Sequence, residues 1–205
     1  MSTSGTVYIV DDDLSMRRAV ARLCQSAGLN AKTYGSATEF LADGNPVSPA
    51  CIVLDLCMPG LGGLDVQAEL AKRSIQTPVV FMTGHGDVPS TVRAMKGGAV
   101  DFVTKPFNNK DLLQIIRGAI SKDVRAQEAE AERQAIHHHL ERLTPREYEV
   151  FALVIRGLLN KQIAAELGAS EQTIKVHRAR VMEKMGVCSV AELVQAAVKA
   201  GVMSK

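Results

Sequence analysis

The sequence predicts an α/β domain followed by an all-α domain. Three runs, at residues 7–10, 50–54 and 79–82, are apolar throughout, as strands buried on both faces of a parallel sheet are. Weaker strand candidates lie at 32–34 and 99–103. Helical patterns alternate with these five strands, near 14–27, 37–43, 64–73, 88–96 and 109–120. Such alternation predicts a parallel sheet with helices on both faces, a doubly wound arrangement.

From residue 143 onward the pattern is helical only. Thr144, Pro145 and Glu147 stand in the order of an N-cap, a first-turn proline and a capping-box acid. Four short helices are expected near 145–157, 160–167, 171–185 and 189–200. Residues 121–142 contain no Gly or Pro and many strong helix formers, which predicts a helical linker. We therefore expect a first domain at 1–120, a linker at 121–142 and a second domain at 143–205.

Composition excludes several classes of protein. Hydrophobic residues make up 46% of the 205 residues and charged ones 22%, as in soluble globular proteins, and no apolar run reaches membrane-spanning length. The N-terminus lacks the basic and apolar regions of a secretory signal. The four cysteines show no metal or disulfide spacing, so we expect reduced thiols in a cytoplasmic protein. The histidines at 137–139 are expected on a solvated helix surface.

Charge is distributed unevenly along the chain. Residues 143–205 hold nine Lys and Arg against six Asp and Glu, whereas residues 1–120 are balanced at eleven of each. The overall net charge is only +2. The basic excess of the second domain is in the direction that DNA binding requires, although it is modest.

Chemically active side chains follow the strands of the first domain. Acids at 11–13 follow the first strand and Asp55 the third, while Thr83 follows the fourth and Lys105 the fifth. Each alone would be an ordinary loop residue, but parallel strands deliver their C-terminal ends to one edge, where ligands bind. Clustered carboxylates suit Mg²⁺, and an Asp can form an acyl phosphate that Lys105 and Thr83 would stabilise.

These motifs, VYIVDDD, CIVLDLCMPGLGGLD, VVFMTGHGD and DFVTKPF, resemble those of bacterial response-regulator receiver domains over about residues 5–120. The resemblance implies a flavodoxin-like sheet of order 2-1-3-4-5 and phosphotransfer from a sensor histidine kinase to Asp55. It implies the following roles around the phosphoryl group: Mg²⁺ ligands at Asp11, Asp12, Asp55 and the backbone carbonyl of Cys57, phosphoryl contacts at Thr83 and Lys105, and a switch aromatic at Phe102.

More specific expectations concern one peptide bond and two side chains near this site. The resemblance also implies that Lys105-Pro106 is a cis peptide, which proline makes accessible. Asp13 is expected outside the pocket, because a helix N-terminus explains an acid there. For Phe102 the alternative is an ordinary core side chain.

Residues 160–180 have the pattern of a helix-turn-helix. Ala164 is small where the two helices would touch, Gly168 lies at the turn, and Ile174 is apolar on the second helix. Ser170 is a suitable N-cap for that helix. The helix then carries basic side chains that could enter the major groove of DNA, or form a solvated basic face: Lys175, His177, Arg178, Arg180 and Lys184.

The segments LTPREYEV, GLLNKQIAAELGAS and EQTIKVHRARVMEKMGV resemble the LuxR-type (NarL/FixJ) DNA-binding domain over about residues 140–203. The resemblance implies base contacts by Lys175, Val176 and Ala179, with Arg178 taking part of the readout because Ala179 is short. It also implies contacts to phosphates by Lys161, Thr173 and Arg180.

Together the two resemblances point to the FixJ-type subgroup of response regulators. They predict a regulator of transcription that binds double-stranded DNA, forms a homodimer when phosphorylated and works with RNA polymerase. One alternative is a DNA-binding protein whose first domain serves only as a dimerisation module. Another is a phosphatase-like hydrolase, which usually needs a second Asp two residues after its nucleophile, where Cys57 stands. We expect no enzymatic activity beyond the protein's own phosphorylation.

Overall fold

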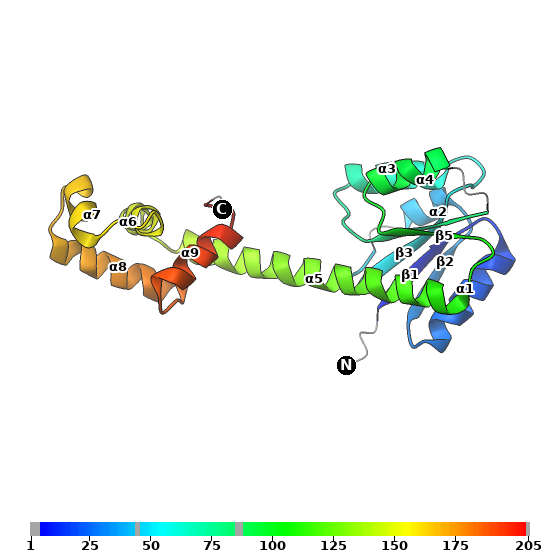
Figure 1. The fold of residues 1–205 in the computed structure, drawn as a ribbon, viewed down its shortest axis with the longest axis horizontal. Helices are drawn as coiled ribbons and strands as arrows, with labels where there is room; N and C mark the ends of the chain where they lie inside the picture. The colour runs from blue at the N-terminus through cyan, green and yellow to red at the C-terminus, as the bar shows by residue number, and fades with distance from the viewer. Residues whose placement is uncertain (1–4, 44–45, 85–87, 204–205) are drawn as a thin grey trace. The chain divides into compact units, whose positions relative to one another are not determined.

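The structure is a computed structural model that describes residues 5–43, 46–84 and 88–203 (Figure 1). The last three residues of the motif VVFMTGHGD, at 85–87, lie outside the described residues. The chain divides into two compact units, at residues 1–127 and 128–205.

The first unit contains the expected parallel sheet. Its strands are β1 (Thr6–Val10), β2 (Asn30–Tyr34), β3 (Ala50–Asp55), β4 (Val79–Thr83) and β5 (Asp101–Thr104). All pairs are parallel and the order is β2-β1-β3-β4-β5, as predicted. Because β3 lies between β1 and β4, its six residues are all buried, which explains their uniformly apolar sequence.

Helices cover both faces of the sheet. α1 (Leu14–Ser26) and the first part of α5 (Asn109–Glu141) pack on one face, and α2 (Ala37–Ala42), α3 (Gly63–Lys72) and α4 (Val88–Lys96) on the other (Figure 1). Alternate residues along each central strand supply the two cores, so that Ile52 and Leu54 face one layer while Cys51 and Val53 face the other. The order of the strands and the helices on both faces define a doubly wound α/β fold.

The strand β5 begins two residues later than predicted. The backbone N–H of Ala99 closes the end of α4 on the carbonyl of Ala94, after Gly98 adopts a positive φ of 93°. Residue 99 therefore belongs to the cap of α4. The first hydrogen bond to the sheet comes one residue later, where the backbone N–H of Val100 donates to the carbonyl of Val79.

The predicted linker is helical but is not a separate element, since α5 runs without a break from Asn109 to Glu141. Near its middle Asp123 is buried in the first unit, where its Oδ2 accepts hydrogen bonds from the backbone N–H of Ala50 (2.8 Å) and the hydroxyl of Ser48. Leu140, near its end, is buried in the core of the second unit. The helix thus packs on both units.

The second unit surrounds one apolar core with α6 (Pro145–Ile155), α7 (Asn160–Leu167), α8 (Glu171–Met185), α9 (Val190–Lys199) and the end of α5. The predicted caps are present: Thr144 and Glu147 form a capping box, and the hydroxyls of Ser170 and Ser189 accept from the backbone of Thr173 and Glu192. These local signals explain why the predicted and observed ends of the helices agree within two residues.

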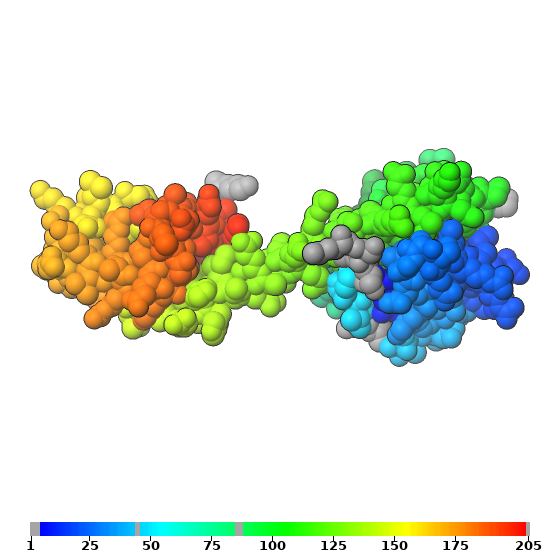
Figure 2. Space-filling model, turned by 90° about the horizontal axis from the view of Figure 1, so that it is seen from below, coloured from blue at the N-terminus to red at the C-terminus, as the bar shows by residue number. Residues whose placement is uncertain are grey.

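The expectation of solvated histidines at 137–139 is wrong for two of the three. His137 Nε2 lies 3.0 Å from the carbonyl of Ala200, and His139 Nδ1 lies 2.8 Å from that of Lys184. They join α5 to the C-terminal ends of α9 and α8, whereas His138 is exposed. Figure 2 shows α9, in red, against the yellow-green end of α5.

Within the described part of the chain, no helix combines the length and the apolar character that a membrane span requires. Cys24 and Cys51 are buried, Cys57 and Cys188 are exposed, and all four are free thiols, as expected.

Candidate functional site

Three carboxylates meet at the C-terminal edge of the sheet. Asp11 follows β1 and Asp55 ends β3, and because these strands are paired, with Val10 beside Leu54, the two acids are neighbours. One carboxylate oxygen from each of Asp11, Asp12 and Asp55 lies within 4.8 Å of the others. Asp11 is fully buried and Asp55 is 6% exposed, while Asp12 is open to solvent.

A lysine ammonium connects two of these acids. Lys105 Nζ lies 2.6 Å from Asp11 Oδ2 and 2.9 Å from Asp55 Oδ2. The backbone N–H of Lys105 donates to the carbonyl of Thr83 (2.7 Å), which fixes the loop after β5 against the end of β4. The Lys105-Pro106 peptide is cis, as predicted.

Burial and the neighbouring charges act differently on the two partners of this cluster. Burial raises the pKa of Asp55 above its ordinary value, and the nearby Asp11 adds to the effect, while the hydrogen bond and charge of Lys105 oppose it. Burial alone would lower the pKa of Lys105, but its hydrogen bonds to Asp11 and Asp55, with their charges, outweigh burial and raise it. Lys105 therefore remains an ammonium between two carboxylates.

Thr83 and Phe102 differ in their environments. Thr83 is 1% exposed, and it follows Met82, the residue that pairs with Asp55. Thr83 therefore lies beside the carboxylate cluster, as the strand ends predicted. Phe102 is 39% exposed on β5, so the alternative of an ordinary core side chain is wrong.

The loop after Asp55 is held tightly to the strand end. The backbone N–H of Cys57 donates to Asp55 Oδ1 (3.3 Å), and the thiol of Cys57 faces solvent. Gly63 opens α3 so close to β3 that a Cβ there would lie 2.4 Å from the carbonyl oxygen of Asp55. The motif CIVLDLCMPGLGGLD thus contains a glycine that the site requires, which its spacing alone did not reveal.

Two residues near Asp11 have structural roles. Asp13 caps α1, with its Oδ1 accepting from the backbone N–H of Ser15 (2.8 Å), and it stays outside the cluster, as expected. Arg17 was not singled out in the sequence. Its guanidinium donates to the backbone carbonyl of Asp11 (2.6 Å), so α1 helps to position that acid.

The donor set fits a divalent cation. Three carboxylates face one ammonium, so negative charge is in excess, and the carboxylate oxygens are hard ligands of the type that Mg²⁺ prefers. Asp12 is open to solvent, which leaves room for the water molecules that Mg²⁺ usually retains.

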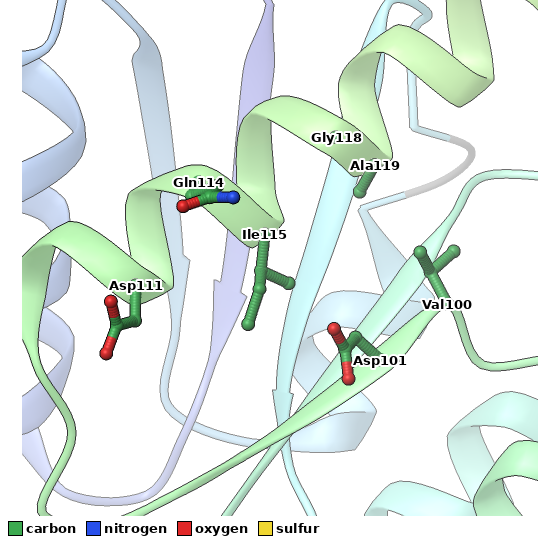
Figure 3. Close-up of a pocket in the computed structure, with 7 residues that line it drawn as sticks. All are labelled: Val100, Asp101, Asp111, Gln114, Ile115, Gly118 and Ala119. Carbon is green, nitrogen blue, oxygen red and sulfur yellow. The ribbon is translucent and has the colours of Figure 1, made fainter.

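A hollow of about 450 Å³ elsewhere in the first unit lacks this chemistry. Figure 3 shows Ile115 projecting from α5 into the space between Asp111 and Asp101. Its lining offers carboxylates and apolar groups but neither an ammonium nor a hydroxyl: Val100, Asp101, Asp111, Gln114, Ile115, Gly118 and Ala119. The strand ends, where carboxylates and an ammonium meet, are therefore the better candidate for a phosphoryl site.

In the second unit, α7 and α8 form the predicted helix-turn-helix. Gly168 ends α7 with a left-handed φ of 61°, Ala164 is buried at the contact between the helices, and Ile174 is fully buried. These three residues have the roles that the sequence predicted for them.

The candidate DNA-binding side chains fall into two groups. One group is exposed: Lys161 on α7, and Thr173, Lys175, Val176, Ala179 and Arg180 on α8. Val176 is 43% exposed, which leaves it free for an apolar contact.

The other group is partly buried, and two of its three members form hydrogen bonds within the unit. Arg178 Nη1 donates to Asn160 Oδ1 (2.9 Å). Lys184 Nζ lies 2.6 Å from Glu147 Oε2 and donates to the carbonyl of Arg142 (3.0 Å), so it ties α8 to the start of α6. The Nδ1 of His177 is buried and has no hydrogen-bond partner among the described residues. Sequence reasoning had grouped all three with the exposed cations.

Two family models match the chain. Residues 7–117 match the response regulator receiver domain, and residues 141–197 match the LuxR family of bacterial regulatory proteins.

Similar proteins cover nearly the whole chain. Nodulation protein W of Bradyrhizobium diazoefficiens is 48% identical over 194 residues, covering 95% of this chain and 86% of that protein. The transcriptional regulatory protein FixJ of the same species is 42% identical, with 100% of both chains covered. Among solved structures, the response regulator StyR has a TM-score of 0.84 at 43% identity, with 96% of this chain and 100% of that one covered.

The receiver model matches the unit that contains the five-stranded parallel sheet, and the LuxR model matches the helical unit that follows it. The chain belongs to the FixJ-type family of two-component response regulators, in which a receiver domain precedes a LuxR-type DNA-binding domain.

Proposed function

We propose that Asp55 accepts a phosphoryl group from a partner histidine kinase in a Mg²⁺-dependent reaction, and that this modification controls binding of α8 to duplex DNA. The observation that carries the proposal is the cluster at the strand ends. One carboxylate oxygen of Asp55 lies within 4.8 Å of one oxygen each of Asp11 and Asp12, and Lys105 Nζ lies 2.9 Å from Asp55 Oδ2.

Each residue of the cluster has a chemical role in this reaction. An oxygen of Asp55 attacks the phosphorus, and the bond from phosphorus to the donor nitrogen breaks. Lys105 is positioned to stabilise the negative charge of the transferred group, and the Thr83 hydroxyl would donate to it afterwards. Asp11, positioned by Arg17, and Asp12 would hold Mg²⁺ together with Asp55 and the carbonyl of Cys57. When bound, Mg²⁺ would neutralise charge on the phosphoryl oxygens.

Phosphorylation would change the surface around α4 and β5. Added charge draws Thr83 toward the phosphoryl group, and Phe102, on the neighbouring strand, moves inward. The same surface carries exposed apolar side chains that a second copy of the chain would cover: Val88, Val92, Met95 and Phe102. A symmetric dimer would place two α8 helices on paired half-sites.

On DNA, Lys175, Val176 and Ala179 would face base edges, whereas Lys161, Thr173 and Arg180 would contact phosphates. Lys184 is better assigned to the stability of the unit, because its ammonium already binds Glu147. Regulation of transcription then requires RNA polymerase at the same promoter, in the cytoplasm, where bacterial DNA lies.

Labelling with a small phosphodonor tests the first step. The full chain should incorporate one phosphoryl group with acetyl phosphate and Mg²⁺, and Asp55→Asn should not. Asp13→Asn is the matched control, since Asn also caps helices and residue 13 lies outside the cluster. Labelling of Asp55→Asn at the wild-type level would refute the assignment. Steady hydrolysis of phosphate esters would instead favour a hydrolase.

A further inference from the structure

One hydrogen bond joins the start of α7 to α8. The guanidinium of Arg178, half-buried on α8, donates through Nη1 to Oδ1 of Asn160 at 2.9 Å. Asn160 is the first residue of α7. Among the described residues, no other side-chain hydrogen bond or ion pair connects the first turn of α7 with α8.

The first turn of α7 is capped by Gln162, whose Oε1 accepts from the backbone N–H of Leu159 (2.8 Å), but its side chains pack little against the rest of the unit. Leu159 is 68% exposed, Lys161 and Gln162 are exposed, and the first buried residue is Ile163. The opposite end of α7 is fixed differently, because Arg146 Nη2 of α6 donates to the carbonyl of Leu167 (2.6 Å). Among the described residues, the bond between Arg178 and Asn160 is therefore the side-chain hydrogen bond that holds the start of α7 to α8.

We propose that Asn160 is a positioning residue for sequence-specific DNA binding, acting through Arg178; this inference rests on the proposed function of α8. In a helix-turn-helix the first helix crosses the DNA backbone while the second lies in the major groove. The angle between the two helices then sets how deeply Lys175 and Val176 reach the bases. Arg178, which donates to Asn160 through Nη1, serves this geometry.

Comparing the affinity for the preferred DNA site with the affinity for unrelated DNA distinguishes this positioning role from a direct contact with DNA. Non-specific affinity and its salt dependence come from cations that neutralise phosphates. Asn160 is uncharged, so Asn160→Ala leaves the cations of the domain in place. Loss of one hydrogen bond to a charged group should lower affinity for the preferred site about tenfold. Affinity for unrelated DNA and the salt slope should stay within about twofold of wild type.

The experiment uses the full phosphorylated chain, a duplex obtained by binding-site selection and an unrelated duplex of equal length. Gln162→Ala is the matched control. It removes an amide from the same turn whose oxygen, within the described part of the chain, accepts from the backbone N–H of Leu159 and accepts no hydrogen bond from α8. This variant should retain the wild-type ratio of the two affinities. Asn160→Asp keeps an acceptor for Arg178 and should also retain most of that ratio, even if added negative charge lowers both affinities.

A double mutant closes the test. In an Arg178→Gln background, Asn160→Ala should cause no further loss of preference, because the bond is already absent. Additive losses, or an equal fall on both duplexes with a reduced salt slope, would overturn the inference. So would relaxed specificity at a single base pair in Arg178→Gln. If the wild-type protein prefers no sequence at all, the proposed function fails as well; a wild-type ratio in Asn160→Ala overturns only the role of Asn160.

Discussion

At the scale of single residues, the carboxylate site depends on a glycine as well as on its acids. The backbone of Gly63 passes so close to β3 that a methyl group there would lie 2.4 Å from the carbonyl oxygen of Asp55 and 2.9 Å from the ring of Phe81. Both neighbours are buried, so neither can move away without displacing the strand end that carries Asp55.

Gly63→Ala should therefore lower the free energy of unfolding of the receiver by about 1–3 kcal/mol, the usual range for an overpacked core. This loss of stability can be measured by urea denaturation of the full chain, monitored by a signal that comes from the receiver alone. Gly62→Ala is the control, because its added Cβ meets nothing closer than 3.5 Å and its φ of −79° suits any residue. Equal midpoints for the two variants would show that α3 can shift at no cost.

Sequence reasoning identified four candidate site residues from the ends of the strands. Asp11, Asp55, Thr83 and Lys105 each lie at the C-terminal end of a strand or just after it, and parallel strands bring such residues to one edge. It missed Arg17 and Asn160, because a bond to a backbone carbonyl or to another helix depends on packing that leaves no local pattern. It also placed Lys184 among the DNA contacts, since a basic residue bound to Glu147 cannot be told from a free one by its type.

At the scale of elements, α6 and α8 are joined by a capping interaction that extends into an ion pair. Glu147 accepts from the backbone N–H of Thr144 (2.8 Å) and from Lys184 Nζ (2.6 Å). The hydrogen bond from Lys184, followed by that from Thr144, lowers the pKa of Glu147 to about 2 from the ordinary value of 4.5. The cap of α6 is thereby linked to the last turn of α8.

Because its pKa is lowered, Glu147 makes the stability of the second unit depend on pH. Its contribution to the stability of the second unit is complete above pH 4.5 and is lost as the pH falls from there toward 2. Titration of the Glu147 carboxyl carbon by NMR should give a midpoint near 2. In Lys184→Gln the midpoint should rise toward 4.5, because the largest cause of the shift is removed. An unchanged midpoint in Lys184→Gln would contradict the ion pair.

The element α5 is tied to the sheet by a buried acid. Both hydrogen bonds to Asp123, from the N–H of Ala50 and the hydroxyl of Ser48, end on the same oxygen. An amide oxygen could replace it, so Asp123→Asn should be tolerated. Asp123→Ala leaves the buried N–H of Ala50 without an acceptor and should cost about 1–3 kcal/mol.

Amide hydrogen exchange at Ala50 and urea denaturation measure both Asp123 variants. Asp111→Ala, at an exposed acid of the same helix, is the control and should match the wild type. If Asp123→Ala exchanges at Ala50 as slowly as the wild type, the acid does not hold α5 in place.

At the scale of the whole molecule, two folded units share one helix. α5 contributes Asp123 to the first unit and Leu140, with His137 and His139, to the second. Helix formers without Gly or Pro predicted the helix, but the contacts of Asp123, His137 and His139 could not be predicted, because polar side chains give no apolar pattern. In the proposed mechanism, phosphorylation of Asp55 in the first unit controls DNA binding by the second.

Dimerisation through α4 and β5 belongs to this scale. Val92, 44% exposed in the monomer, would be covered in the dimer, so Val92→Glu would bury a charge in the interface. Phosphorylation should then no longer increase the sedimentation coefficient. Val47→Glu introduces the same charge at an apolar residue 72% exposed in the loop before β3, and it should dimerise normally. Dimerisation of Val92→Glu at the wild-type level would place the interface elsewhere.

The most direct test of the account measures affinity for a selected DNA duplex with and without acetyl phosphate and Mg²⁺, in the wild type and in Asp55→Asn. We predict that the phosphodonor raises the affinity of the wild type and leaves that of Asp55→Asn unchanged, with Asp13→Asn responding as the wild type does. An equal rise in Asp55→Asn, or no rise in the wild-type protein, would contradict control of DNA binding by phosphorylation of Asp55.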